Sequence, residues 1–166
     1  MNRRLPWLIF LAAVLALVFW GWLILFPGPD RIIRKHLAEV AHLASVTPNE
    51  GPLARLANAQ KLTTFCTADV EIAVDIPGRT PQTLSGRDEL LQTALAVRSM
   101  MSNLKVEFLD VGVALESDEQ SAVARLTAKA NLPGENIPEV QELKIAFQKA
   151  GRDWLIRRAE TVRTLH

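Results

Sequence analysis

The spacing of hydrophobic residues divides the chain into one long apolar run and a remainder with two different periods. Within residues 5–26, all but two residues are apolar. From residue 31 to about residue 46, apolar residues recur at helical spacing, which predicts an amphipathic helix. The stretch 47–52 is rich in helix breakers and ends this helix, and a second helix is predicted over about 53–65.

Beyond residue 65 the hydrophobic period changes to two residues, which is typical of β-strands. Apolar residues alternate with polar or small ones from 70 to 76, and a turn then leads to a short strand near 82–84. A third helix is predicted from residue 85 to about 101, with Leu90, Leu91 and Leu95 on its buried face. Four longer strands are predicted at 104–116, 121–132, 139–149 and 154–163.

This order of elements predicts an α+β fold behind an N-terminal transmembrane helix. Hairpin-length turns join the last four strands, so we expect those strands to be antiparallel. Three helices then pack on one face of a curved, mainly antiparallel sheet. The predicted organisation is a tail at 1–4, a transmembrane helix at 5–26, a linker at 27–31 and one folded domain at 32–165.

The apolar run at 5–26 has the length of a membrane span. As a helix it extends about 33 Å, which matches a hydrocarbon core of about 30 Å. A cleaved signal peptide is the alternative, but its apolar region is shorter and a small-x-small cleavage site follows it. We therefore predict an uncleaved single-pass anchor in the cell (inner) membrane. The very short tail 1–4 is expected to stay cytoplasmic, which places the domain on the periplasmic, extracytoplasmic side.

Charge and cysteine content exclude several functions. Beyond residue 26 the chain carries 17 basic and 18 acidic residues, a net charge of −1, so it lacks the basic excess of a nucleic-acid-binding protein. Cys66 is the only cysteine, and its apolar neighbours indicate a small core residue. No phosphate loop, nucleotide fingerprint, Cys-x-x-Cys or paired histidine is present, so no cofactor and no metal is predicted.

Three short patterns then resemble one superfamily. They are Phe65-x-x-x-Asp69-Val70-x-Ile72, Pro77-x(8)-Gly86 and Gly151-x-x-Trp154-x-Ile156. Together with the element order, they resemble the nuclear transport factor 2-like, or SnoaL-like, superfamily. The resemblance implies a cone-shaped domain whose sheet and helices enclose a conical pocket. In some members this pocket is an active site, and in others it binds a ligand or a partner.

An isomerase or dehydratase-type enzyme is one function that the resemblance implies. The region of Asp75 is similar to the part of ketosteroid isomerases that carries their general-base aspartate. Asp110 is a second candidate carboxylate, either on the face of Val106 and Phe108 or as the hydrophilic residue of a bulge. Those isomerases hold the oxyanion with a tyrosine, and this chain has no tyrosine, so the main electrostatic stabilisation is missing.

Other catalytic patterns of the superfamily fit less well. Dehydratase-like members use a histidine with an aspartate, and here only His36 or His42, pointing into the mouth of the cone, would serve. Epoxide-hydrolase-like members use Asp–Arg–Asp, for which Asp75, Arg125 and Asp110 are the candidates. Strand alternation, however, places Arg125 on the face opposite the row of alanine and leucine residues.

A membrane-anchored binding or scaffold module is the function that the sequence favours. Ala122, Ala124, Ala128 and Ala130 share one strand face, which leaves room either for close helix packing or for a ligand cavity. The opposite, polar face is one that pairs two copies in similar proteins, so a homodimer is predicted. The expected partners are a small apolar ligand or an envelope protein. An accessory domain for an unrelated envelope process is a third reading.

Overall fold

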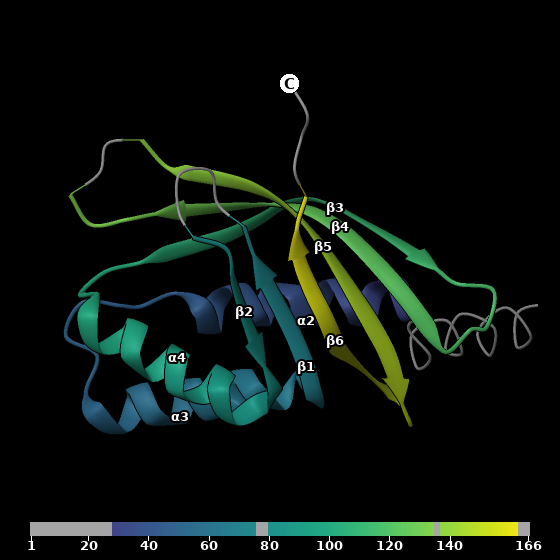
Figure 1. The fold of residues 1–166 in the computed structure, drawn as a ribbon, viewed down its shortest axis with the longest axis horizontal. Helices are drawn as coiled ribbons and strands as arrows, with labels where there is room; N and C mark the ends of the chain where they lie inside the picture. Colours follow the sequence, from purple (N-terminus) through teal and green to yellow (C-terminus); the bar gives the residue numbers. More distant parts are fainter. Residues whose placement is uncertain (1–27, 76–79, 135–136, 163–166) are drawn as a thin grey trace, which may run out of the picture.

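A computed structural model describes residues 28–75, 80–134 and 137–162, which form three helices and a six-stranded sheet (Figure 1). The predicted α+β class with three helices on a sheet is therefore confirmed. The predicted transmembrane helix at 5–26 lies outside the described residues. Within the described part of the chain, no helix combines the length and the hydropathy that crossing a membrane requires.

The three helices are α2 (Pro29–Ala44), α3 (Pro52–Thr64) and α4 (Gly86–Met100), and each lies within two residues of its predicted range. Both α2 and α3 begin with a proline, whose missing N–H group does no harm in a first helical turn. In α2, Ile33, Leu37 and Ala41 are buried at intervals of four residues, so one apolar stripe of this helix packs against the sheet.

The strands are β1 (Cys66–Val74), β2 (Gln82–Ser85), β3 (Lys105–Leu115), β4 (Ser121–Asn131), β5 (Glu139–Ala150) and β6 (Asp153–Thr161). They lie in the order β2-β1-β6-β5-β4-β3. All neighbours are antiparallel except β1 and β6, so the prediction of a mainly antiparallel sheet is confirmed. Parallel strands cannot be joined by a hairpin and need a long connection. The chain between β1 and β6 forms this connection, and it contains β2, α4 and the strands β3 to β5.

The hydrophobic core lies between the helices and one face of the sheet, which we call the inner face. Phe147, Ile33, Leu37 and Val70 are its largest fully buried side chains. On the opposite, outer face, ion pairs link neighbouring strands: the Lys144 Nζ lies 3.2 Å from a Glu160 carboxylate oxygen. The apolar and polar positions of the strands therefore separate onto the two faces, as strand alternation requires.

Candidate functional site

The inner face changes from buried to partly exposed along β4 and β5. On β4, Ala122 and Ala124 are fully buried, whereas Ala128 is partly exposed. On β5 the same change runs from Phe147, which is buried, to Leu143, which is not. Since β4 and β5 are antiparallel, the end of β4 and the start of β5 lie together, and their partly exposed residues mark the same end of the cone.

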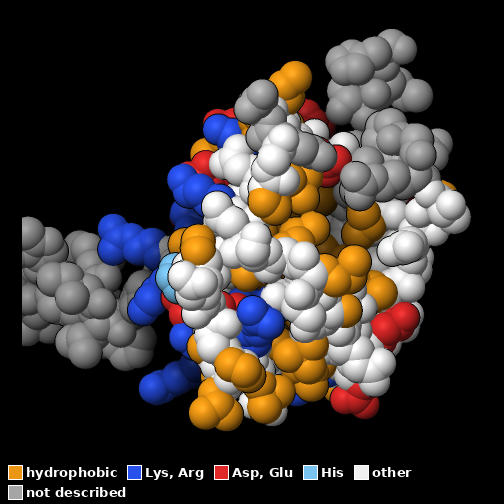
Figure 2. All heavy atoms as spheres, turned by 90° about the vertical axis from the view of Figure 1, so that its left-hand side faces the viewer, with side chains coloured by type: hydrophobic (Ala, Val, Ile, Leu, Met, Phe, Trp, Pro, Cys, Tyr) orange, Lys and Arg blue, Asp and Glu red, His pale blue; other side chains and the backbone are white. Residues whose placement is uncertain are grey.

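Burial falls toward the same end on β1 and β6, whereas the inner residues of β3 are partly buried along its whole length. Five partly buried apolar residues, one from each of five strands, lie against the fully buried core, and we call them the open half of the cone: Ile72, Phe108, Ala128, Leu143 and Ala159. Phe108 is the direct cross-strand partner of Ala128, and Ile72 is that of Ala159. Figure 2 views the molecule from this side, where hydrophobic side chains gather in and around a hollowed surface.

Large hydrophobic side chains are also exposed on the elements around this opening. Met100 ends α4, and Ile137 and Val140 lie where β5 begins. Met100 is 84% exposed and Ile137 is 79% exposed, which is unusual for such large apolar groups on one end of a small domain. The rim of the opening is therefore apolar as well as its inner wall.

The alanine row on β4 divides into a buried half and a partly exposed half. Ala122 and Ala124 are at most 1% exposed and allow close packing in the core. Ala128 and Ala130 lie beyond them on the same strand face and are only partly buried. One half of the row therefore supports helix packing and the other half lines the opening.

The structure places Asp75 one residue beyond the end of β1, where its main chain is tied to β6. Its backbone N–H donates to the Thr161 Oγ1 at 2.9 Å, and that hydroxyl donates to the Asp75 carbonyl at 3.2 Å. Alternation along β1 puts Ile72 on the inner face and its neighbours Glu71 and Ala73 on the outer face. The role of the Asp75 carboxylate in catalysis stays a prediction.

Asp110 occupies a β-bulge, which was one of its two predicted placements. The register between β3 and β4 shifts between Leu109 and Gly112, and Asp110 has a positive φ of 52°. The extra residue reverses the alternation, so Val111 packs against the core while Asp110 is exposed. The other placement, on the face of Phe108, is wrong because that count assumed a regular strand.

The candidate catalytic residues do not all line one hollow. Asp110 lines a hollow of about 220 Å³ together with Arg125, Glu142 and Leu143, of which Leu143 belongs to the open half. Arg125 is exposed and lies opposite the buried alanine face, as strand alternation predicted. Asp75 follows β1 and does not line this hollow, and three strands separate β1 from β3. The structure therefore brings Asp110 and Arg125 together, and an Asp–Arg–Asp arrangement that includes Asp75 stays a prediction.

The two histidines of α2 do not line the opening either. The Nδ1 of His36 lies 3.1 Å from the Trp154 carbonyl oxygen, so this nitrogen carries the hydrogen of the bond. Its ring also meets the Phe65 ring edge-on, with the centroids 5.2 Å apart. Trp154 is buried, so His36 lies at the closed part of the cone, while His42 is exposed.

Cys66 is buried in the core, as its sequence context predicted. Burial raises the pKa of the Cys66 thiol to about 11, an effect only partly offset by the nearby Arg87 guanidinium. The neutral thiol is a poor nucleophile, so Cys66 is not a catalytic nucleophile at neutral pH.

We expect the native Cys66 thiol to react with a disulfide reagent at pH 8 far more slowly than the same thiol in the unfolded chain. A colour assay of thiol release, with and without denaturant, measures this difference. Because the folded-state pKa lies above the ordinary value, the reaction should accelerate, and stability should fall, as the pH rises toward 11. Rapid reaction of the native protein at pH 8 would contradict the burial.

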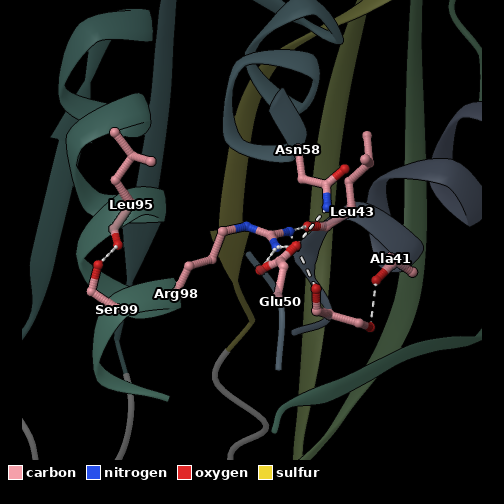
Figure 3. Close-up of polar contacts among 8 residues, drawn as sticks. Ala41, Leu43, Glu50, Asn58, Leu95, Arg98 and Ser99 are labelled. Carbon is pink, nitrogen blue, oxygen red and sulfur yellow. Dashed lines mark hydrogen bonds and ion pairs between the residues drawn. The ribbon is translucent and has the colours of Figure 1, made fainter. Parts of the chain in front are cut away.

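A polar cluster that the sequence reasoning missed joins the helices near the opening (Figure 3). The Arg98 side chain extends from α4 and donates to both Glu50 carboxylate oxygens, at 2.7 and 2.8 Å. It also donates to the Leu43 and Ser45 carbonyls at the end of α2. The two charged side chains are 3% and 5% exposed, so this ion pair is buried.

The sequence did contain a signal for this cluster. Arg98 follows Leu91 and Leu95 at intervals of four and three residues, so it lies on the predicted buried face of the third helix. A charged side chain at such a position needs a partner of opposite charge. Its partner, Glu50, lies in the stretch 47–52, where an acidic residue gives no sign of being buried.

The described residues contain no group of three or more histidine, cysteine or acidic side chains that could hold a metal ion. Acidic residues whose pKa is lowered are surface groups. For Glu39, the main cause is a hydrogen bond from Lys61, and for Asp118 it is a hydrogen bond from Ser121. Neither lies in the open half of the cone.

No protein-family model and no curated protein matches the sequence. Solved structures nevertheless share the fold. An NTF2-like protein with a cystatin-like fold from Novosphingobium aromaticivorans is 21% identical, with 91% of this chain and 86% of that chain covered and a TM-score of 0.59. A protein of that organism provisionally named scytalone dehydratase is 16% identical, with coverages of 82% and 84% and a TM-score of 0.59. Another, provisionally named an aromatic ring hydroxylase, is 13% identical, with coverages of 81% and 88% and a TM-score of 0.63.

These similarities define the class of fold. The described part of the chain has the nuclear transport factor 2-like, or cystatin-like, fold that the sequence patterns resembled. Some of the similar proteins carry enzyme names, and others have no known function. At these identities the similarity establishes the fold alone, and one fold supports many functions. The function must therefore be argued from the site.

Proposed function

We propose that this domain is a binding or scaffold module that takes an apolar group into the open half of its cone. The group is a small apolar ligand or an apolar side chain of an envelope protein. The observation that carries the proposal is that Ile72, Phe108, Ala128, Leu143 and Ala159 lie against the buried core and are only partly buried. An apolar pocket with an apolar rim gains free energy when a partner removes it from water.

Catalysis by proton abstraction has less support. It needs a base at the pocket and a donor that stabilises the resulting oxyanion. The chain has no tyrosine, Asp110 lies in an outward bulge, and Cys66 is held as a neutral thiol. Asp75 alone is left as a base. If the enzymatic alternative holds, Asp75→Asn abolishes turnover while the protein stays folded.

We also propose that residues 5–26 anchor the protein in the cell membrane, with the domain on the extracytoplasmic side. The support is the length and composition of this run. Protease added to intact spheroplasts should then digest the domain. Full protection of the domain, with digestion only after lysis, would place it in the cytoplasm.

Filling the open half should block binding. We expect Ala128→Leu to weaken the binding of an apolar fluorophore such as N-phenyl-1-naphthylamine by about tenfold, because the added side chain occupies the wall next to Phe108. The measurement is a fluorescence titration of the chain from residue 28 onward, which contains every described element. Unchanged affinity would show that the fluorophore does not bind the open half.

Ala124→Leu is the matched control, since it makes the same change on the same strand face. Ala124 is fully buried, so the larger side chain overpacks the core and costs about 1–3 kcal/mol of stability. The folded fraction should keep the affinity of the unchanged protein for the fluorophore. Loss of affinity in both variants would mean that binding depends on general packing rather than on the opening.

Homodimerisation through the outer face remains part of the proposal. Its support is the row of charged side chains on this face, in which Lys144 pairs with Glu160 and Arg158 with Glu71. Such groups can exchange partners with a second copy. Sedimentation of the chain from residue 28 onward at high micromolar concentration should show a dimer, and a monomer would count against this pairing.

A further inference from the structure

The helices α3 and α4 are attached to the core by few buried side chains. In α2, four residues are buried, including Ile33 and Leu37. In α3 the one buried residue is Ala59, and in α4 the buried residues are Leu90 and Arg98. The pair α3–α4 therefore covers the sheet with little buried apolar area, and apolar burial is what usually fixes a helix in place.

Two arginines attach α4 at its two ends. Near its start, the Arg87 Nε donates to the Cys66 carbonyl at 2.8 Å, next to the buried Leu90. Near its end, Arg98 holds Glu50 and the carbonyls at the end of α2. Figure 1 shows that this second end of α4 lies where β3 begins, and Phe108 of the open half is in the first part of β3. One attachment is thus in the closed part and the other is beside the opening.

We propose that α3 and α4 form a movable wall of the cone and that the Arg98–Glu50 pair is the latch that holds this wall closed. The inference rests on the proposed binding function, because the wall would admit the bound group. The pivot is the start of α4 at Arg87 and Leu90, and the moving part is the end of α4 with the start of α3.

A buried ion pair suits a latch for a physical reason. Removing one partner by mutation leaves the other charge buried and unpaired, which is costly. Opening the wall is different, because both Arg98 and Glu50 then reach water and regain the hydration that burial had removed. The closed and open states can therefore differ little in free energy. An apolar contact of equal size would lose its whole contribution on opening.

In the closed state, the charged groups of the latch are hydrogen-bonded to each other and to neighbouring polar groups. Glu50 accepts a further bond from the Asn58 amide at 2.6 Å, so α3 joins α4 through the same carboxylate. Figure 3 shows Arg98, Glu50 and Asn58 directed toward one another from three segments. Because one carboxylate connects these segments, they should release together rather than one by one.

Amide hydrogen exchange on the full chain in detergent micelles tests the wall. In the unchanged protein, we expect the amides of α3 and α4 to be at least about 100-fold less protected than those of β4 and β5. Their exchange should also depend only weakly on added denaturant, since a local opening exposes little surface. If both sets exchange together with the same denaturant dependence, α3 and α4 open only by global unfolding and the proposal is overturned.

Glu50→Gln tests the latch itself. It should speed exchange in α3 and α4 by about 30-fold or more without denaturant, while β4 and β5 stay more protected than these helices. The control is Glu39→Gln, which removes the exposed pair between Glu39 and Lys61, at 2.5 Å, and so makes the same change between α2 and α3. In the Glu39→Gln variant, the amides of α3 and α4 should exchange at the same rate as in the unchanged protein.

Two outcomes would overturn the latch. In one, Glu50→Gln has no more effect than Glu39→Gln. In the other, the amides of α3 and α4 exchange at the same rate as those of β4 and β5 in the Glu50→Gln variant. Neither readout involves a ligand, so failure of the fluorophore titration would remove the binding function while leaving the movable wall to stand on the exchange data.

Discussion

Phe147→Ala is expected to lower the free energy of unfolding by about 3–5 kcal/mol, because the deletion leaves a cavity in the closed part of the cone. Phe147 is 2% exposed and has Ala122 and Ile156 as its direct cross-strand partners. The Ala122 side chain is too small to fill the cavity that the deletion leaves. This loss is a large part of the stability of a typical domain, about 5–15 kcal/mol. Urea unfolding followed by circular dichroism measures it.

Phe108→Ala is the matched comparison, since it removes the same side chain from the open half. Phe108 is only partly buried, so water already reaches part of its site and the deletion creates less new cavity. Its stability loss should be less than half of that for Phe147→Ala, while its affinity for the apolar fluorophore should fall. Equal stability losses would mean that both ends of the cone are packed alike, which contradicts the exposure pattern.

The difference between these two phenylalanines could not be derived from the sequence. Both lie at apolar positions of alternating strands, and alternation identifies the inner face but not the depth along it. Depth depends on which helix covers which part of the strand. That coverage is set by α2, α3 and α4 together, through contacts between residues far apart in the chain.

Local elements, in contrast, were predictable to within a few residues. Apolar residues recur at helical spacing in the predicted helices, and the helix-breaking residues at 47–52 separate the first helix from the second. The strands β3 to β6 follow one another through short turns, so their antiparallel order also follows from the sequence. The parallel pairing of β1 with β6 did not follow, because it joins segments about 90 residues apart and no turn marks it.

The candidate site shows where strand counting fails. The residues Val106, Phe108 and Asp110 share a face only in a regular strand, and one extra residue at the bulge reverses the face. A positive φ is common enough for aspartate that the sequence allowed the bulge, but it did not require one. Arg98 shows the opposite case, where a charged residue on an apolar helix face was a readable sign of a buried partner.

Arg98→Met is expected to lower the free energy of unfolding by up to about 3 kcal/mol, because a larger cost is avoided when the wall opens and Glu50 reaches water. The substitution keeps much of the apolar stem but leaves the Glu50 carboxylate buried, with Asn58 as its remaining donor. The Leu43 and Ser45 carbonyls also lose the guanidinium. Lys61→Met, which removes an exposed ion pair, should cause a change too small to resolve in the same urea experiment.

The double variant Arg98→Met with Glu50→Leu separates two causes of that loss. If the cost of Arg98→Met comes from an unpaired buried charge, removing that charge should restore a large part of the stability. If the cost comes from lost contacts between the helices, the double variant should be at least as unstable as the single one. We expect recovery, because the Glu50 side chain is only 5% exposed in the closed state. Absence of recovery would show that the pair contributes to stability through its geometry.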